Sequence, residues 1–193
     1  MNLILASASP RRKDLLERLG IPFEIRTLPV QEKTDGPWFR IALDNAFLKA
    51  DAVARMYPDS VVIGADTVIE FGSEVLGKPS SKADAFSMLS RFSGKTHQVV
   101  TGCAVLCLNR NIRIRFAEIT RVHFRELSPQ VIEEYLDAVP VLDKAGAYAI
   151  QDHGDLLADK VEGSLNNVIG LPVERLEFPL KKIFSLCSGR EKV

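Results

Sequence analysis

Short apolar runs and amphipathic stretches alternate along the first part of the chain. The run Leu3-Ile4-Leu5 predicts a buried strand, and Ser9 and Pro10 follow where an N-cap and a first helical residue belong. Residues 22–28 favour a second strand. Apolar residues then recur near helical spacing over residues 39–56, which predicts an amphipathic helix.

The same alternation continues to the end of the chain. Strands are expected at residues 61–71, 97–108 and 112–127, and helices at residues 83–92, 129–138 and 173–185. Strands that alternate with helices are typical of α/β folds, and the two adjacent long strands add an antiparallel hairpin. The prediction is a mixed, twisted sheet flanked by helices.

Composition narrows the possible functions. With 193 residues, of which 46% are hydrophobic, the chain can bury one sizeable core, drawn out into two lobes. The basic and acidic residues balance at 25 each, so no overall field attracts nucleic acid or an acidic membrane surface. Any affinity for anions must therefore be local.

Nothing in the sequence predicts export or membrane insertion. The first apolar run is too short for a secretory signal, and its arginines follow it, so Ala6-Ser7-Ala8 is not interpreted as a cleavage site. No segment approaches the roughly 20 apolar residues of a membrane span. The odd set of cysteines, Cys103, Cys107 and Cys187, lacks disulfide spacing, which fits a reducing compartment. We expect a cytoplasmic protein.

The cysteines and histidines are predicted to be structural. Cys103 and Cys107 would share a strand face roughly 13 Å apart, too far to bind one metal ion. His97, His123 and His153 show no metal-ligand spacing and are interpreted as surface or packing residues.

The start of the first helix is a candidate anion site. Unpaired N–H groups and the helix dipole attract anions there, Ser7 and Ser9 add hydroxyl groups, and Arg11 and Arg12 offer planar forks that suit phosphate oxygens. Two arginines suggest a polyphosphate. The alternative is a pair of solvated first-turn arginines, but cations there oppose the helix dipole.

Asp66 is a single carboxylate inside the apolar run VVIGADTVI. An unpaired charge is costly near a core, so Asp66 should contact a metal, a cation or a substrate; the alternative is a strand-end aspartate bonded to backbone amides. Gly64 implies close backbone approach, and Thr67 adds a polar group. Lys78, on a turn beside Gly77, is a weaker candidate.

Two later segments leave alternatives open. In LDKAGAYAIQDHG, small residues between Lys144 and Gln151 would admit a flat ligand, and Gln151 could bond a base edge. In VEGSLNNVIGLP, Glu162, Asn166 and Asn167 either cap turns or contact a ligand.

Several blocks together resemble the Maf family of nucleoside triphosphate pyrophosphatases. They are LASASPRRKDLLERLGIPFEI, VIGADTVIEF, LGKP, SGKTHQVVTG, LDKAGAYAIQ and VEGS followed by NVIGLP, in family order along nearly the whole chain. The resemblance implies one elongated α/β domain over residues 1–193, similar to the inosine triphosphate pyrophosphatase fold, with a cleft between two lobes. It also implies a homodimer, which is the common assembly in the family. It also implies hydrolysis of a nucleoside triphosphate to the monophosphate and pyrophosphate with a divalent cation, Mg²⁺ or Mn²⁺.

The resemblance also implies roles at matching positions. Asp66 matches the family's proton acceptor, Glu32 in VQEK matches an acidic residue that helps to hold the metal, and Lys78 is expected near the phosphates. Because an aspartate bound tightly to a metal is a poor base, either Asp66 or Glu32 could take the proton.

Substrate contacts are implied in the same way. The phosphate side comprises Ser7, Ser9, Arg11, Arg12 and Lys49. Thr67 and Gln151, read with Arg12, match specificity positions of the branch that acts on dTTP and UTP.

Two further points follow from the resemblance. Asp152 replaces a glycine, and Leu165, Asn166 and Asn167 replace the usual aromatic pair, and the sequence leaves the effect of both departures on the base pocket open. The rival function is a nucleotide-binding regulator of septum formation with little turnover.

Overall fold

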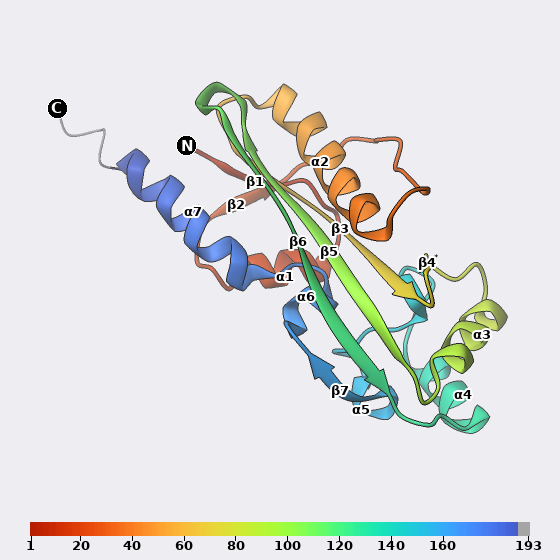
Figure 1. Ribbon diagram of the computed structural model, residues 1–193. Helices are drawn as coiled ribbons and strands as arrows, with labels where there is room; N and C mark the ends of the chain where they lie inside the picture. The colour runs from red at the N-terminus through yellow and green to blue at the C-terminus, as the bar shows by residue number, and fades with distance from the viewer. Residues whose placement is uncertain (189–193) are drawn as a thin grey trace.

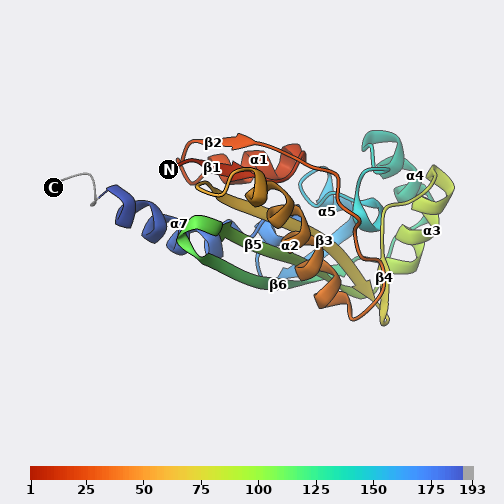
Figure 2. The ribbon, with the colours of Figure 1, turned by 90° about the horizontal axis from the view of Figure 1, so that it is seen from above.

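Three long antiparallel strands run along the molecule in the computed structural model, which describes the backbone of residues 1–188 and the side chains of residues 1–185. They are β3 (Val61–Phe71), β5 (Thr96–Cys107) and β6 (Ile112–Phe124). Seen from above, helices α3 and α4 lie at one end of these strands and α7 lies at the other (Figure 2). The prediction for Cys187 lies outside the described side chains.

Four short strands complete a seven-stranded mixed sheet of order β2-β1-β3-β5-β6-β7, with β4 also paired to β3 (Figure 1). They are β1 (Leu3–Leu5), β2 (Phe23–Ile25), β4 (Glu74–Leu76) and β7 (Ala158–Glu162). Strand β1 is parallel to β2 and to β3, and all the other pairs are antiparallel.

Helices cover both faces and one end of the sheet. The α-helices are α1 (Pro10–Glu17), α2 (Trp38–Met56), α3 (Lys82–Phe92), α4 (Pro129–Ala138), α5 (Gly154–Leu157), α6 (Leu165–Ile169) and α7 (Val173–Ser188). Short 3₁₀ turns occupy Leu108–Arg110 and Ala145–Ala147. None of the helices within the described residues is long and apolar enough to cross a membrane.

The expected α/β fold is confirmed, and the long strands and longer helices lie within a few residues of their predicted bounds. The second strand is shorter than predicted, because only Phe23–Ile25 pairs with β1. The short elements β4, β7, α5 and α6 were not predicted, since a segment of three to five residues shows too little periodicity.

The alternation of side chains along the strands builds two cores on opposite faces of the sheet. One face, with Leu3, Leu5 and Ile63, packs against α1 and α7. The other, with Ile4 and Val62, packs against α2. Cys103 and Cys107 lie buried on the first face, which confirms them as core residues.

Two glycines let α2 lie directly on the sheet. A Cβ at Gly64 in β3 would lie 2.2 Å from the carbonyl oxygen of Ala46, and one at Gly102 in β5 would lie 2.3 Å from that of Ala42. No side chain fits either position without moving the helix. The close backbone approach predicted at Gly64 is therefore confirmed, and its partner is α2.

A third core fills the end of the molecule that carries α3 and α4. At its centre the ring of His97 stacks on Phe92 at 4.3 Å and forms a hydrogen bond with the hydroxyl group of Tyr148. Burial, with a smaller effect of His123, lowers the pKa of His97 from 6.5 to about 3. This confirms His97 as a packing residue, neutral in the folded protein.

Replacement of Gly64 by alanine should destabilise the protein. The added methyl group meets helix backbone, so the free energy of unfolding should fall by at least about 2 kcal/mol in chemical denaturation. Gly77→Ala is the matched control, because a Cβ at Gly77 meets nothing within 4 Å. Equal stability of the two variants would contradict the packing described here.

His97 should make stability depend on pH. Its pKa is lower in the folded than in the unfolded chain, so protonation favours unfolding, and stability should fall as the pH drops from about 6.5 toward 3. The loss is up to about 1.4 kcal/mol per pH unit in that window. Urea denaturation between pH 7 and pH 4 measures it against His97→Gln, which has no titrating ring and should show a shallower slope.

Candidate active site

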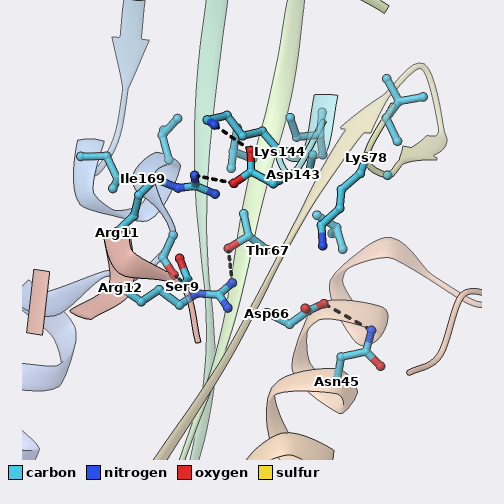
Figure 3. A pocket seen from close by; sticks show the side chains of 18 of the residues that line it. Ser9, Arg11, Arg12, Asn45, Asp66, Thr67, Lys78, Asp143, Lys144 and Ile169 are labelled. Carbon is cyan, nitrogen blue, oxygen red and sulfur yellow. Dashed lines mark hydrogen bonds and ion pairs between the residues drawn. The ribbon is translucent and has the colours of Figure 1, made fainter. Parts of the chain in front are cut away.

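A gap along the edge of β3 defines the site. Strand β1 pairs with β3 as far as Ile63, and β4 begins to pair only at Ile69. Within the described sheet, residues 64–68 of β3 therefore have no strand neighbour on that side. Asp66 and Thr67 point to opposite faces of the sheet, as alternation requires. Both side chains reach the same space because this edge is open (Figure 3).

A pocket of about 550 Å³ lies at this gap, within the range of small-molecule sites. The carboxyl end of β1 leads through the loop at Ser7 into α1, so the start of α1 faces β3 across the pocket. Nine of the ten predicted site residues line it. They are Ser9, Arg11, Arg12, Glu32, Lys49, Asp66, Thr67, Lys78 and Gln151.

The structure holds the Arg12 guanidinium in one orientation. Its Nε donates to the Gly170 carbonyl oxygen at 2.9 Å, Nη1 donates to Ser7 Oγ at 3.1 Å and Nη2 donates to Thr67 Oγ1 at 3.1 Å. Ser7 is the tenth predicted residue, and it acts here through Arg12. A guanidinium has five N–H groups, so two stay available to a ligand.

Thr67 is oriented by a further hydroxyl group. Thr101 donates to the Asn167 carbonyl oxygen at 3.0 Å, which leaves the Thr101 oxygen to accept from Thr67 at 2.9 Å. Thr67 can then only accept from Arg12. This chain of donors fixes the guanidinium before any ligand arrives.

The other residues of the helix start also face the pocket. Ser9 is the N-cap by position, but its hydroxyl group makes no capping bond, contrary to the usual role of such a serine. Arg11 forms an ion pair with Asp143 at 3.3 Å (Figure 3). Although burial opposes the shift, hydrogen bonds and charge from Lys144 and Arg11 lower the pKa of Asp143.

Across the pocket two carboxylates converge on one ammonium group. Lys49 Nζ lies 2.6 Å from Asp66 Oδ1 and 3.1 Å from Glu32 Oε1. Asp66 is 8% exposed, and its second oxygen accepts from Asn45 Nδ2 at 3.3 Å. The reading of Asp66 as an aspartate bonded to backbone amides is wrong, because its partners are side chains of α2.

The two charged walls face each other. Burial lowers the pKa of Arg12, while the charge of Asp66 opposes that effect, which places the two groups within electrostatic reach. Lys78 extends toward the same space (Figure 3) and forms no hydrogen bond or ion pair with any described residue. Gln151 is exposed at the rim and is likewise free of partners among the described residues.

The remainder of the pocket wall is largely apolar. It comprises Ile41, Val68, Ile69, Val75, Leu76, Val99, Tyr148, Ala149, Ile150, Val168 and Ile169. Charged groups at one part of a pocket and apolar side chains at another suit a ligand with an anionic tail and a flat, less polar head.

The acidic wall fits a divalent cation that a substrate helps to coordinate. Mg²⁺ is usually held by one or two carboxylates together with phosphate oxygens. Glu32 and Asp66 already share one cation, the Lys49 ammonium, so the pair attracts positive charge to one point. Among the described residues no cluster of three or more histidine, cysteine or acidic side chains could hold a metal alone.

Asn45 was missed in the sequence. It lies on the buried face of α2, one turn before Lys49, and it bonds both Asp66 and the loop that carries Glu32. The feature of the sequence that could have indicated it is a polar amide on a helix face that otherwise carries the apolar residues Ile41, Ala42 and Ala46. Lys144, which the sequence marks only as the start of a small-residue stretch, lines the pocket together with its neighbour Asp143.

Asp152 follows Gln151 in the chain but is not among the residues that line the pocket, and the same holds for Leu165, Asn166 and Asn167. Asn166 donates to Glu174, and Asn167 donates to the Val99 carbonyl oxygen. Asn166 takes part in the local turn, where its carbonyl oxygen accepts from Gly170 and Leu171, whereas the side chain of Asn167 ties α6 to β5 and β6. Val168 and Ile169 supply the pocket contacts of this segment.

The fold and the pocket define an α/β protein with a site for an anionic small molecule. A family model described as Maf-like protein matches residues 2–183, and the chain belongs to this family. It is 44% identical over 183 residues to a dTTP/UTP pyrophosphatase of Bacillus anthracis, covering 93% of this chain and 94% of the relative. A dTTP/UTP pyrophosphatase of Akkermansia muciniphila is 45% identical over 174 residues, covering 89% and 90%.

A solved structure supports the fold independently. The HAM1 protein from Coxiella burnetii aligns with a TM-score of 0.55 at 14% identity, covering 94% of this chain and 99% of that chain. At this identity the likeness concerns the fold alone.

Loss of Arg12 should weaken anion binding. Arg12→Ala removes the oriented guanidinium, so the affinity for inorganic triphosphate, measured by calorimetry, should fall at least about tenfold. Arg18→Ala is the control, because Arg18 lies after α1 ends and contacts Asn166 outside the pocket. Circular dichroism verifies folding, and equal affinities would remove Arg12 from the anion site.

Proposed function

We propose that the protein hydrolyses nucleoside triphosphates, above all dTTP and UTP, to the monophosphate and pyrophosphate. The observation that carries this proposal is the oriented guanidinium of Arg12 facing the Asp66 carboxylate across a single pocket. The names of relatives at 44% and 45% identity support the reaction and the nucleotides. The activity would serve a housekeeping role in the nucleotide pool by hydrolysing these triphosphates.

The charges suit attack at the α-phosphorus. A water molecule attacks phosphorus, the bond from that phosphorus to the bridging oxygen of the β-phosphate breaks, and pyrophosphate leaves with the bridging electrons. Negative charge grows on the phosphate oxygens, so catalysis depends on positioning and electrostatics. Arg11, Arg12 and Lys78 stabilise that charge, and a carboxylate of the acidic wall accepts the proton of the water.

The two carboxylates divide two tasks. Glu32 and Asp66 would hold a divalent cation, Mg²⁺ or Mn²⁺, which when bound supplies neutralisation of phosphate charge. The carboxylate less engaged with the cation would act as the base. Lys49, which lies between them, would neutralise the carboxylates until the substrate enters and then contact phosphate.

Preference for pyrimidines would arise at the apolar part of the pocket, away from its charged walls. Gln151 offers a donor and an acceptor that no described residue occupies, and a base edge needs both. The apolar wall that includes Tyr148, Val168 and Ile169 would pack on the flat ring. Thr67 contributes by fixing Arg12, which borders the same space.

A panel of triphosphates tests the function. Pyrophosphate release from dTTP, UTP, CTP, ATP, GTP and modified pyrimidine triphosphates, with and without Mg²⁺ or Mn²⁺, should show fastest turnover of dTTP and UTP and dependence on the cation. The rival regulator would bind one nucleotide and release no more than one equivalent of pyrophosphate. Preference for purines would contradict the assigned branch.

Asp66→Asn should abolish turnover in a folded protein. The substitution removes the charge from the acidic wall, so kcat should fall at least about 100-fold. Asp137→Asn, on the exposed surface of α4, is the matched control and should retain wild-type kcat. Normal pyrophosphate release by the Asp66 variant would refute its role.

We further propose that the protein acts as a homodimer, as the family resemblance implies, and that it is cytoplasmic, as the sequence analysis expects. Light scattering after gel filtration measures the assembly.

A further inference from the structure

Asn45 occupies a position where a polar side chain is unexpected. It lies in α2 on the face that packs against the sheet, between the buried residues Ala42 and Ala46, and only 3% of it is exposed. A buried amide lowers stability unless its polar atoms are paired. The partners of this amide therefore indicate why it is there.

Two of its hydrogen bonds clamp the loop that carries Glu32. Asn45 Oδ1 accepts from the Lys33 backbone N–H at 2.7 Å, and Asn45 Nδ2 donates to the Lys33 carbonyl oxygen at 3.0 Å. The side chain thus pairs with one backbone unit as a neighbouring strand would. Lys33 is the residue next to Glu32, so the clamp acts on the acidic residue directly.

This clamp is the main backbone attachment of that loop. Among the residues the structure describes, the backbone of residues 27–36 forms hydrogen bonds at Lys33 alone, and both go to Asn45. The remaining ties are the surface ion pair of Lys33 with Asp44 and the contact of Glu32 with Lys49. An exposed ion pair contributes little.

The third hydrogen bond reaches the opposite carboxylate. Asn45 Nδ2 donates to Asp66 Oδ2 at 3.3 Å (Figure 3). Lys49, one helical turn later, contacts Oδ1. Each oxygen of Asp66 has its own donor from α2. The plane of this carboxylate is therefore set by two neighbouring turns of one helix.

We propose that Asn45 is a positioning residue that holds Glu32 and Asp66 at a fixed separation for the cation and the attacking water. It does so without touching the reacting atoms. A single side chain acts on both members of the acidic pair, so its loss should affect their joint action more than the binding of the nucleotide. This inference rests on the function proposed above.

Two variants and a control test the inference. Asn45→Leu keeps the branched shape of the side chain, although it is bulkier, and removes all three hydrogen bonds. Asn45→Ser removes them without risk of overpacking. Asp44→Asn is the matched control, because Asp44 precedes Asn45 in α2 and holds the same lysine only by its side chain. Thermal unfolding of all three proteins shows whether they fold.

Three measurements separate positioning from a general loss of structure. The Mn²⁺ concentration for half-maximal pyrophosphate release should rise at least about tenfold in both Asn45 variants, while KM for dTTP changes less than kcat. Electron paramagnetic resonance should show weaker Mn²⁺ binding in the presence of an α,β-methylene analogue of dTTP. Hydrogen exchange should accelerate at the Lys33 amide, whose N–H donates to Asn45, and the Asp44 variant should match the wild type throughout.

Two results would overturn the inference. If both Asn45 variants fold and keep wild-type Mn²⁺ dependence while the wild type turns over dTTP, the proposed function stands and the role of Asn45 falls. If Asn45→Leu and Asp44→Asn change the Mn²⁺ dependence equally, the effect belongs to the loop as a whole. A wild type without turnover of any triphosphate would instead refute the proposed function, and the role of Asn45 with it.

Discussion

The contact of helix α2 with two glycines of the sheet is the constraint on which the site depends. Gly64 and Gly102 bring the helix backbone within contact of β3 and β5, closer than side chains would allow. The side chain of Asn45 is short, and it meets Asp66 because the helix lies so close to the sheet. Lys49, one helical turn later, contacts the other oxygen of the same carboxylate. The close packing of α2 on the sheet therefore also sets the geometry of the Asp66 carboxylate.

Some of the charges in the pocket are paired before a ligand enters. Lys49 is shared by the carboxylates of Glu32 and Asp66, and Asp143 is paired with Arg11. Arg12 is held instead by neutral acceptors, two hydroxyl groups and one carbonyl oxygen, so its charge stays uncompensated by direct contact. Preorganised cations of this kind stabilise an anion without reorganisation during the reaction. The site is therefore organised for a ligand that brings several negative charges.

Much of the fold could be predicted, and the errors have a common origin. The long strands and helices repeat their apolar pattern over enough residues to be recognised. The elements β4, β7 and α6 are too short for that, and β7 depends on pairing with β6 far away in sequence. Among the site residues, nine of ten predicted positions line the pocket, whereas Asn45 was missed. A single asparagine in an apolar stripe gives no sign of which groups it will bond.

The sequence by itself determined the alternating elements, the apolar faces of the strands and the residue types able to bind phosphate and a cation. Those features follow from local periodicity and from side-chain chemistry. Only the tertiary structure decided that Asp66 and Thr67, which alternate on a strand, share one pocket. The physical reason is the unpaired stretch of β3 between β1 and β4, an edge that exists only once the sheet has assembled. The tertiary structure likewise decided that Lys33 and Asp66, far apart along the chain, both bond the buried side-chain amide of Asn45.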